Sequence, residues 1–190
     1  MTSQPATTVQ AVPAAGTYGI DTQRSTITYT SRHMFGLGTV RAEFSISAGQ
    51  LESGASLEEC GAGAVMDAAS FRSGNARRDS DVKAKGLLDV ARFPDIVFSS
   101  TEVRAADGGM VLVGNVAMHG VVAPVEVRVS SWEQSSSGRI RVLARAEHLD
   151  RLSFGITGSR GWVGRYFDLG FDIVAVPAAP GRESDAQVIP

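Results

Sequence analysis

The side chains of this 190-residue chain that could carry out polar chemistry are few and scattered. The three histidines, His33, His119 and His148, are far apart in sequence, and none forms the close helical pair that often holds a metal ion. Cys60 is the single cysteine, which excludes an intrachain disulfide and a multi-cysteine metal site. The sequence therefore predicts no metal and no cofactor, and it contains no motif for nucleophilic or nucleotide chemistry.

Two arginines and one histidine are candidates to bind the polar head group of a ligand, if the ligand has one. Arginine offers a forked pair of donors to phosphate, and histidine can donate to a carbonyl oxygen. Arg32 and His33 end a predicted strand, and Arg78 lies in a predicted helix, so the order of elements can bring them to one end of the fold. The alternatives are an ion pair of Arg78 with Asp79 or Asp81 on a solvated helix face, and a structural hydrogen bond for His33.

Composition favours one well-buried domain. Hydrophobic residues make up 43% of the chain, which is long enough for one core. The net charge is −2, with Lys and Arg dispersed along the sequence, so nucleic acid and an anionic membrane surface are not expected partners. No apolar run has the length of a transmembrane helix, which predicts no integral membrane segment.

Both ends of the chain differ in composition from the middle. Residues 1–16 and 178–190 are rich in Ala, Pro and polar residues without periodicity, so we expect disordered tails around a domain at 17–177. Residues 1–16 also lack the basic and apolar regions of a secretory signal. We therefore expect a cytoplasmic protein.

The segment from Asn75 to Gly86 is the principal predicted helix. Asn75 is a favourable N-cap, aspartates follow near the helix start, and Gly86 supplies a stop. Leu87 and Leu88 come next as an apolar anchor. Such a helix either closes one end of a β-structure or forms the lid of a cavity.

Alternating hydrophobicity predicts about eight long strands around this helix. Gly61 and Gly63, inside the third of them, suggest a bulge or a strong bend. These features favour an all-β fold, an extended eight-stranded antiparallel lipocalin-like barrel with one principal helix near its mouth, and a β-sandwich is the structural alternative. The predicted strands cover residues 25–32, 39–51, 56–71, 96–103, 110–118, 121–132, 139–148 and 166–176.

Several positions expected to point into the barrel carry small side chains, which would leave space at its centre. Larger aromatic and flexible residues could line this space and adapt to a branched apolar chain. The small residues are Ala42, Ala62, Ala64, Gly114, Ala144 and Ala146, and the expected lining residues are Phe35, Phe44, Phe71, Phe93, Phe98, Met118, Phe154, Trp162 and Tyr166.

A series of motifs in one order resembles the YceI family of lipocalin-like, polyisoprenoid-binding proteins. The resemblance spans residue 18 to about residue 176. The motifs are Tyr18-Gly-Ile-Asp21 with Ser25-Thr-Ile-Thr-Tyr29, Arg32-His33, Val40-Arg-Ala-Glu-Phe44, Arg78-Asp79, Leu87-Leu-Asp89 with Phe93-Pro-Asp-Ile-Val-Phe98, Gly114-Asn-Val-Ala-Met-His-Gly120, and Asp150-Arg151 with Phe154-Gly-Ile156.

The resemblance implies a barrel whose apolar tunnel takes an isoprenoid tail, with the helix against its mouth. It implies binding rather than catalysis, and a homodimer is common among the relatives. The expected ligand is therefore a polyisoprenoid, an isoprenoid quinone or another hydrophobic small molecule that the protein sequesters or carries. Many family members are secreted, and this chain departs from them in residues 1–16.

Two other functions are consistent with the same sequence. An enzyme such as a cyclase or isomerase could use the cavity to position a hydrophobic precursor, with His33, Arg78, Asp79 or Tyr166 as polar groups. A purely structural interaction barrel would instead have a filled interior and an exposed apolar patch.

Overall fold

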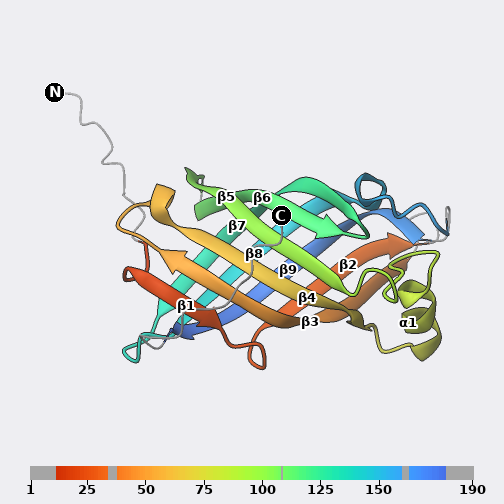
Figure 1. Cartoon of the computed structure of the whole chain (residues 1–190), viewed down its shortest axis with the longest axis horizontal. Helices are drawn as coiled ribbons and strands as arrows, with labels where there is room; N and C mark the ends of the chain where they lie inside the picture. Colours follow the sequence, from red (N-terminus) through yellow and green to blue (C-terminus); the bar gives the residue numbers. More distant parts are fainter. Residues whose placement is uncertain (1–11, 34–37, 108, 160–162, 179–190) are drawn as a thin grey trace.

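The protein folds into a closed antiparallel β-barrel with one α-helix at one end (Figure 1). The computed structural model describes residues 12–33, 38–107, 109–159 and 163–178. Within these ranges the strands are β1 (Gly16–Ile20), β2 (Thr26–His33), β3 (Gly38–Ser53), β4 (Gly61–Arg72), β5 (Asp95–Ala106), β6 (Gly109–Met118), β7 (Val121–Gln134), β8 (Ile140–Asp150) and β9 (Val163–Pro177), and the helices are α1 (Ala76–Lys83) and the short 3-10 turns η2 (Leu57–Glu59) and η3 (Arg151–Phe154).

Eight long strands form the ring of the barrel. They run in the order β3-β2-β9-β8-β7-β6-β5-β4, and β4 pairs with β3 to close the ring. The short β1, which was not among the predicted strands, pairs with both β3 and β9 beyond the start of β2, where Tyr18 faces Leu51 and Ile20 faces Ala175. Strands β1 and β2 therefore share one position of the ring, and the closed barrel that the sequence predicts is confirmed.

Alternation along the strands places one set of side chains inside the barrel. On β3, Ala42, Phe44 and Ile46 are buried, whereas Arg41 and Glu43 are exposed. This pattern buries a branched or aromatic side chain at every second residue of a strand. The result is one large hydrophobic cluster in the barrel, with a smaller cluster around Tyr18 at the β1 end.

Helix α1 forms where it is predicted but is shorter. The side chain of Asn75 accepts a hydrogen bond from the backbone N–H of Arg78, which confirms the N-cap. The helix ends at Lys83, and its C-cap is Ala84 in an extended conformation. Gly86 therefore lies outside the helix and does not supply its stop. Within the described ranges, neither α1 nor a 3-10 turn has the length and hydrophobicity of a membrane-spanning helix.

The predicted bulge at Gly61 and Gly63 is wrong. These residues pair regularly with Glu52 and Gln50 of β3. The register between β3 and β4 shifts instead between Glu43 and Ser45 and again between Ile46 and Ala48. The irregularity thus lies nearer the α1 end of β4, where this strand leaves the ring toward the helix.

Candidate functional site

A cavity of about 310 Å³ opens in the barrel at the α1 end. Its walls come from strands β2, β3, β4, β5, β6, β8 and β9, and it is closed in part by α1, η3 and the segment after α1. The lining is mainly apolar. Its hydrophobic side chains are Tyr29, Val40, Phe44, Met66, Phe71, Val82, Leu87, Leu88, Ile96, Val116, Met118, Leu149, Phe154, Ile156, Val163, Phe167 and Leu169.

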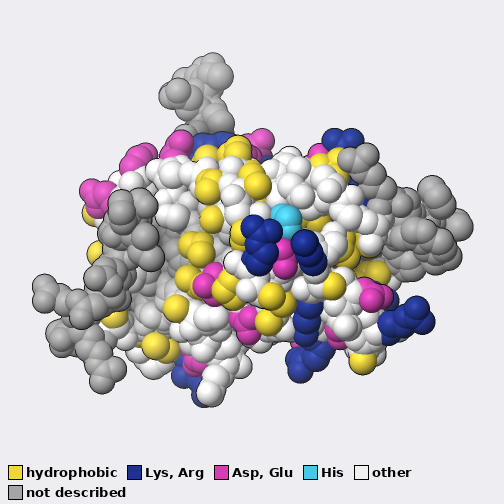
Figure 2. Space-filling model, turned by 45° about the vertical axis from the view of Figure 1, so that its right-hand side comes forward, with side chains coloured by type: hydrophobic (Ala, Val, Ile, Leu, Met, Phe, Trp, Pro, Cys, Tyr) yellow, Lys and Arg dark blue, Asp and Glu magenta, His cyan; other side chains and the backbone are white. Residues whose placement is uncertain are grey.

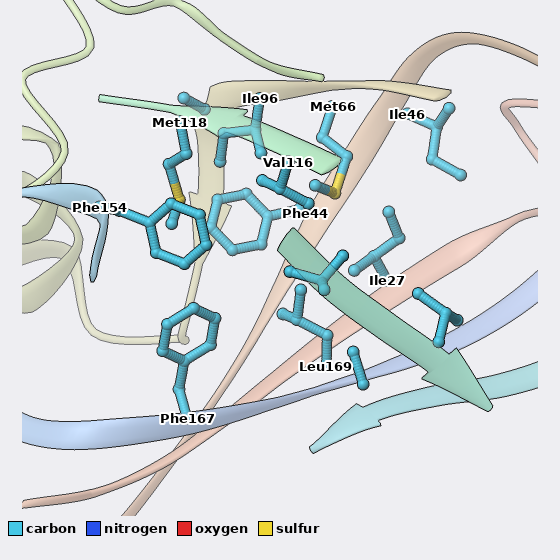
Figure 3. Close-up of a cluster of buried hydrophobic side chains, with 14 of the residues drawn as sticks. Ile27, Phe44, Ile46, Met66, Ile96, Val116, Met118, Phe154, Phe167 and Leu169 are labelled. Carbon is cyan, nitrogen blue, oxygen red and sulfur yellow. The ribbon is translucent and has the colours of Figure 1, made fainter. Parts of the chain in front are cut away.

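Four aromatic rings form one wall of this cavity. The Tyr29 ring stacks on Phe167 at a centroid distance of 5.4 Å and meets Phe71 edge to face at 5.7 Å. The rings of Phe44 and Phe71 are 5.3 Å apart, also edge to face. Figure 3 shows Phe44, Met66 and Phe167 pointing into the same space from β3, β4 and β9. This wall presents a rigid apolar surface, and the methionines add adaptable bulk.

The segment after α1 covers the mouth from one side. Leu87 and Leu88 are 6% and 9% exposed and contact the cavity, which confirms their role as an apolar anchor. Gly86 lies against Gly158 of the segment after η3, so closely that a Cβ atom on Gly158 would collide with the carbonyl oxygen of Gly86. The two segments that cover the cavity are thus in direct backbone contact.

A few polar side chains lie within the apolar wall of the cavity. Arg151 is 5% exposed, and its guanidinium donates to the carbonyl oxygens of Gly164 at 3.1 Å and Ile156 at 2.6 Å. Ser31 is also 5% exposed and donates to the carbonyl oxygen of Tyr166 at 3.0 Å. Burial raises the pKa of the Tyr29 hydroxyl, although a hydrogen bond with Ser31 and the charge of Arg151 act in the opposite direction. Tyr29 therefore keeps its proton at neutral pH.

Two further arginines stand at the rim of the cavity. Arg32 is exposed and Arg78 is half-buried, and both contact the cavity. Arg78 donates through Nε to the Ser73 hydroxyl at 2.7 Å and through Nη2 to the Ser73 carbonyl oxygen at 3.1 Å. Asp79 accepts from the backbone N–H and the hydroxyl of Ser73, and this hydrogen bonding lowers the pKa of the Asp79 carboxyl. Ser73 therefore fixes the position of Arg78.

Half of the predicted ligand-contacting residues come together around this cavity. They come from β2, β3, β4, α1, β6 and η3, elements that are widely separated in sequence. Their roles in binding stay predictions. The residues are Arg32, Phe44, Phe71, Arg78, Met118 and Phe154.

Two predicted lining residues point elsewhere. Tyr166 is 39% exposed and stacks on His148 on the outer surface, because on β9 the neighbouring Phe167 takes the inward position. Phe93 is half-buried outside the cavity lining, with its ring 4.9 Å from the ring of His119. Alternation along a strand allows one of two adjacent aromatic residues to face inward, and the sequence did not show which one.

Phe98 is also absent from the lining, because it packs in the middle of the barrel. A side chain at Gly114 would place its Cβ atom 2.9 Å from Cε2 of Phe98, so the ring fills the space above this glycine. The predicted residues Phe35 and Trp162 lie outside the described residues, as does the side chain of His33.

The small inward residues do not mark the cavity, which corrects the expectation drawn from them. Ala42, Ala144 and Ala146 are 3%, 7% and 2% exposed and belong to the hydrophobic cluster, but they do not contact the cavity. In the view of Figure 3, Ile27 and Ile46 lie on one side of Phe44, and Phe154 and Phe167 on the other. Large side chains such as Ile27 occupy the space beside the small ones, so the middle of the barrel is packed.

A second, smaller cavity of about 80 Å³ lies on the other side of this packed middle, toward β1. Among the predicted small residues, Ala62 contacts it. Its wall also includes Tyr18, Leu51, Cys60 and Trp132. Among the described residues, none lines both cavities.

Sequence reasoning did not assign a role to the polar residues inside the wall. Arg151 belongs to the family motif Asp150-Arg151, but a charged residue is ordinarily expected on the surface. The available signal was the succession of a capping Asp150, an arginine and the turn glycine Gly155, whose φ is 70°. Among the described residues, no group of three or more His, Cys, Asp or Glu side chains lies close enough to hold a metal ion.

Comparisons with known proteins agree with the barrel fold. A family model described as a YceI-like domain matches residues 18–175. A UPF0312 protein of Yersinia pestis is 38% identical over 61 residues, which is 32% of this chain, and the matched stretch spans only 32% of that relative's length.

Two solved structures share the fold. BcnA of Burkholderia cenocepacia has a TM-score of 0.71 at 22% identity. The matched region covers 83% of this chain and 99% of the BcnA chain. A polyisoprenoid binding domain from Saccharophagus degradans has a TM-score of 0.61 at 14% identity, with coverage of 85% and 98%. At these identities the likeness shows the barrel fold.

Proposed function

Since the chain belongs to the YceI-like domain family, we propose that its barrel binds a long apolar ligand, such as a polyisoprenoid, an isoprenoid quinone or a similar lipid. The observation that carries the proposal is the cavity of about 310 Å³ with an apolar lining at the α1 end. Pockets of this size and character typically bind small molecules. The solved polyisoprenoid binding domain with the same fold supports a ligand of this class.

The size of the cavity limits how much of a ligand it holds in the present conformation. At about 30 Å³ per water-sized group, its volume corresponds to on the order of ten heavy atoms. A longer tail must extend out of the mouth or displace side chains. Met66 and Met118 in the wall have flexible side chains that can make such room.

We propose that the protein sequesters or carries this ligand in the cytoplasm, and that it does so as a homodimer. An apolar stripe on the outside of the barrel supports the dimer. Val97 on β5 pairs with Ala117 on β6, which pairs with Val122 on β7, and the two valines are 38% and 66% exposed. Adjacent exposed apolar side chains are a common feature of protein interfaces.

The dimer is tested by sedimentation velocity of the wild type and of Val122→Lys. A wild-type dimer that becomes a monomer in Val122→Lys supports the proposal. A monomeric wild type at all concentrations refutes this part of it, while ligand binding is unaffected.

Native mass spectrometry of the protein purified from cells tests the ligand. We expect a bound species whose mass difference corresponds to a lipid and which is released by organic solvent. A protein that carries no lipid and that takes up no isoprenoid alcohol in solution would contradict the proposal. The variant Val116→Phe, which narrows the cavity, serves as a matched sample and should carry less lipid.

A further inference from the structure

We infer that the cavity selects amphiphiles whose head is an oxyanion, a carboxylate or a phosphate, over neutral or cationic molecules with the same tail. This inference rests on the proposed function, because it concerns the head of the ligand that the cavity holds. It adds the charge of the ligand, which the apolar lining alone does not determine.

The charges around the cavity are of one sign. Arg32, Arg78 and Arg151 contact it, and no Asp or Glu is among its lining residues in the described part of the chain. This contrasts with the whole chain, whose net charge is −2. Figure 2, which brings the α1 end forward, shows Lys and Arg side chains beside hydrophobic ones on this side of the molecule, with Asp and Glu side chains among them. A cluster of like charges at an apolar wall attracts an opposite charge strongly, because the surroundings screen it poorly.

The three arginines stand at different depths. Arg32 is exposed at the rim, Arg78 is half-buried, and Arg151 is 5% exposed within the wall. A head group at the mouth can therefore contact Arg32 and Arg78. The polar atoms of the head group that reach furthest into the cavity can approach Arg151. Guanidinium groups bind carboxylate and phosphate through paired, charge-assisted hydrogen bonds.

Two of these arginines are held in position before any ligand binds. Arg151 donates to the carbonyl oxygens of Gly164 and Ile156, and Arg78 donates to both oxygens of Ser73. A side chain that is already ordered loses less entropy on binding, which favours affinity. The hydroxyl groups of Tyr29 and Ser31 lie in the same wall and are neutral hydrogen-bonding groups.

Asp79, which follows Arg78 in the sequence, is held by other groups. Asp79 directs its carboxylate to the backbone N–H and hydroxyl of Ser73, the same residue that holds Arg78. The carboxylate therefore lies on the Ser73 side of Arg78, and Asp79 does not contact the cavity. The charge of Asp79 weakens the field of Arg78, and that of Asp150, which pairs with Arg165, weakens the field of Arg151, but no carboxylate is among the described residues that line the cavity.

The test compares ligands with one tail and different heads. Farnesyl monophosphate, farnesol and farnesylamine would be titrated against the protein loaded with the neutral dye Nile red, and displacement would be followed by fluorescence at low salt. We expect the phosphate to bind about tenfold or more tightly than the alcohol, as one charge-assisted contact allows, and the amine to bind more weakly than the alcohol. A fatty acid and its methyl ester form a second pair of ligands with one tail. This pair tests whether the cavity prefers a carboxylate head to a neutral one, as it is expected to prefer a phosphate.

The variant that tests the assignment is the double substitution Arg32→Gln and Arg78→Gln. It should reduce the preference for the anionic head several-fold, measured as the ratio of the affinities for farnesyl monophosphate and farnesol in the same variant. The matched control is Arg128→Gln with Arg145→Gln, a cross-strand pair on the outer face that removes the same charge. Far-UV circular dichroism would establish that both double variants keep the fold.

The outcomes separate this inference from the proposed function. Equal affinity for the phosphate, the alcohol and the amine overturns the charge selection while the barrel still binds lipid. A preference that is reduced as much by the outer-face control also overturns it, because long-range charge would then explain the effect. Failure of every ligand to displace the dye would instead contradict the proposed function.

Discussion

Val116 and Val127 are inward-facing valines in different surroundings. Val116 on β6 contacts the cavity, whereas Val127 on β7 is part of the packed middle and contacts neither cavity. Both are 8% exposed. The cavity therefore depends on where the large side chains lie along the barrel and cannot be recognised from the burial of a single residue.

We predict that Val116→Phe occupies part of the cavity and weakens ligand binding by roughly five- to tenfold, since it adds about four heavy atoms and each ligand atom that they displace contributes roughly 0.3 kcal/mol. Stability should change by less than about 1 kcal/mol, because empty space accepts the larger side chain. Dye binding and urea denaturation measure the two effects.

The same substitution at Val127 is the control. Val127→Phe adds the same atoms where no space exists, so we expect a loss of about 1–3 kcal/mol in the free energy of unfolding. If the two variants were equally destabilised, the space near Val116 would not be available to a ligand.

At the level of elements, the cover of the cavity is formed by two chain segments that meet at Gly86 and Gly158. The segment after α1 carries Leu87 and Leu88, and the segment after η3 carries Ile156, all of which contact the cavity. A side chain at Gly158 would collide with the Gly86 carbonyl, whereas a Cβ on Gly86 would have no atom within 4 Å. The contact between the segments therefore requires glycine at position 158 but not at position 86.

We predict that Gly158→Ala separates the two segments and lowers stability by about 1–3 kcal/mol, while Gly86→Ala is nearly neutral. Hydrogen exchange of residues 84–90 should become faster in Gly158→Ala, since the segment loses its contact. A neutral Gly158→Ala, or a Gly86→Ala that is equally destabilised, would show that the backbone contact does not hold the cover.

At the level of the whole molecule, charged pairs link neighbouring strands on the outside of the barrel. Arg141 on β8 binds Asp172 on β9 at 2.7 Å, and Arg165 on β9 binds Asp150 at the end of β8 at 2.8 Å. The hydrogen bonds from these arginines lower the pKa of both carboxyl groups. Exposed pairs of this kind contribute little to stability, because solvent screens the attraction between the two charges.

The sign of the resulting pH dependence follows from the lowered pKa values. The unfolded chain binds protons at about pH 4, before the folded protein does, so these pairs stabilise the fold above that pH and lose their contribution as pH falls through the folded pKa. We predict that Asp172→Asn lowers stability slightly at pH 7 and makes the acid decline shallower, as measured by urea denaturation from pH 7 to about pH 3. Asp107→Asn, in an exposed turn, is the control and should leave the slope unchanged.

The strands of the barrel could be predicted from the sequence, because alternation of side chains is a local property, whereas the same pattern also allowed a β-sandwich. On β3 the succession Ala42, Phe44 and Ile46 against Arg41 and Glu43 predicts one buried face without reference to any other strand. The helix start at Asn75 was also local, since a cap depends on residues within one turn. The family motifs added the class of ligand as an expectation.

The tertiary structure alone decided where the cavity lies. Small residues such as Ala144 predicted space, but side chains from opposite strands fill the middle of the barrel, and no local pattern encodes that packing. Arg151 could not be identified as a cavity residue, because its burial depends on the carbonyl groups of Gly164 and Ile156 that the fold brings to it. Position along the barrel axis arises from the register of all eight long strands together, and this is a property that a single strand does not possess.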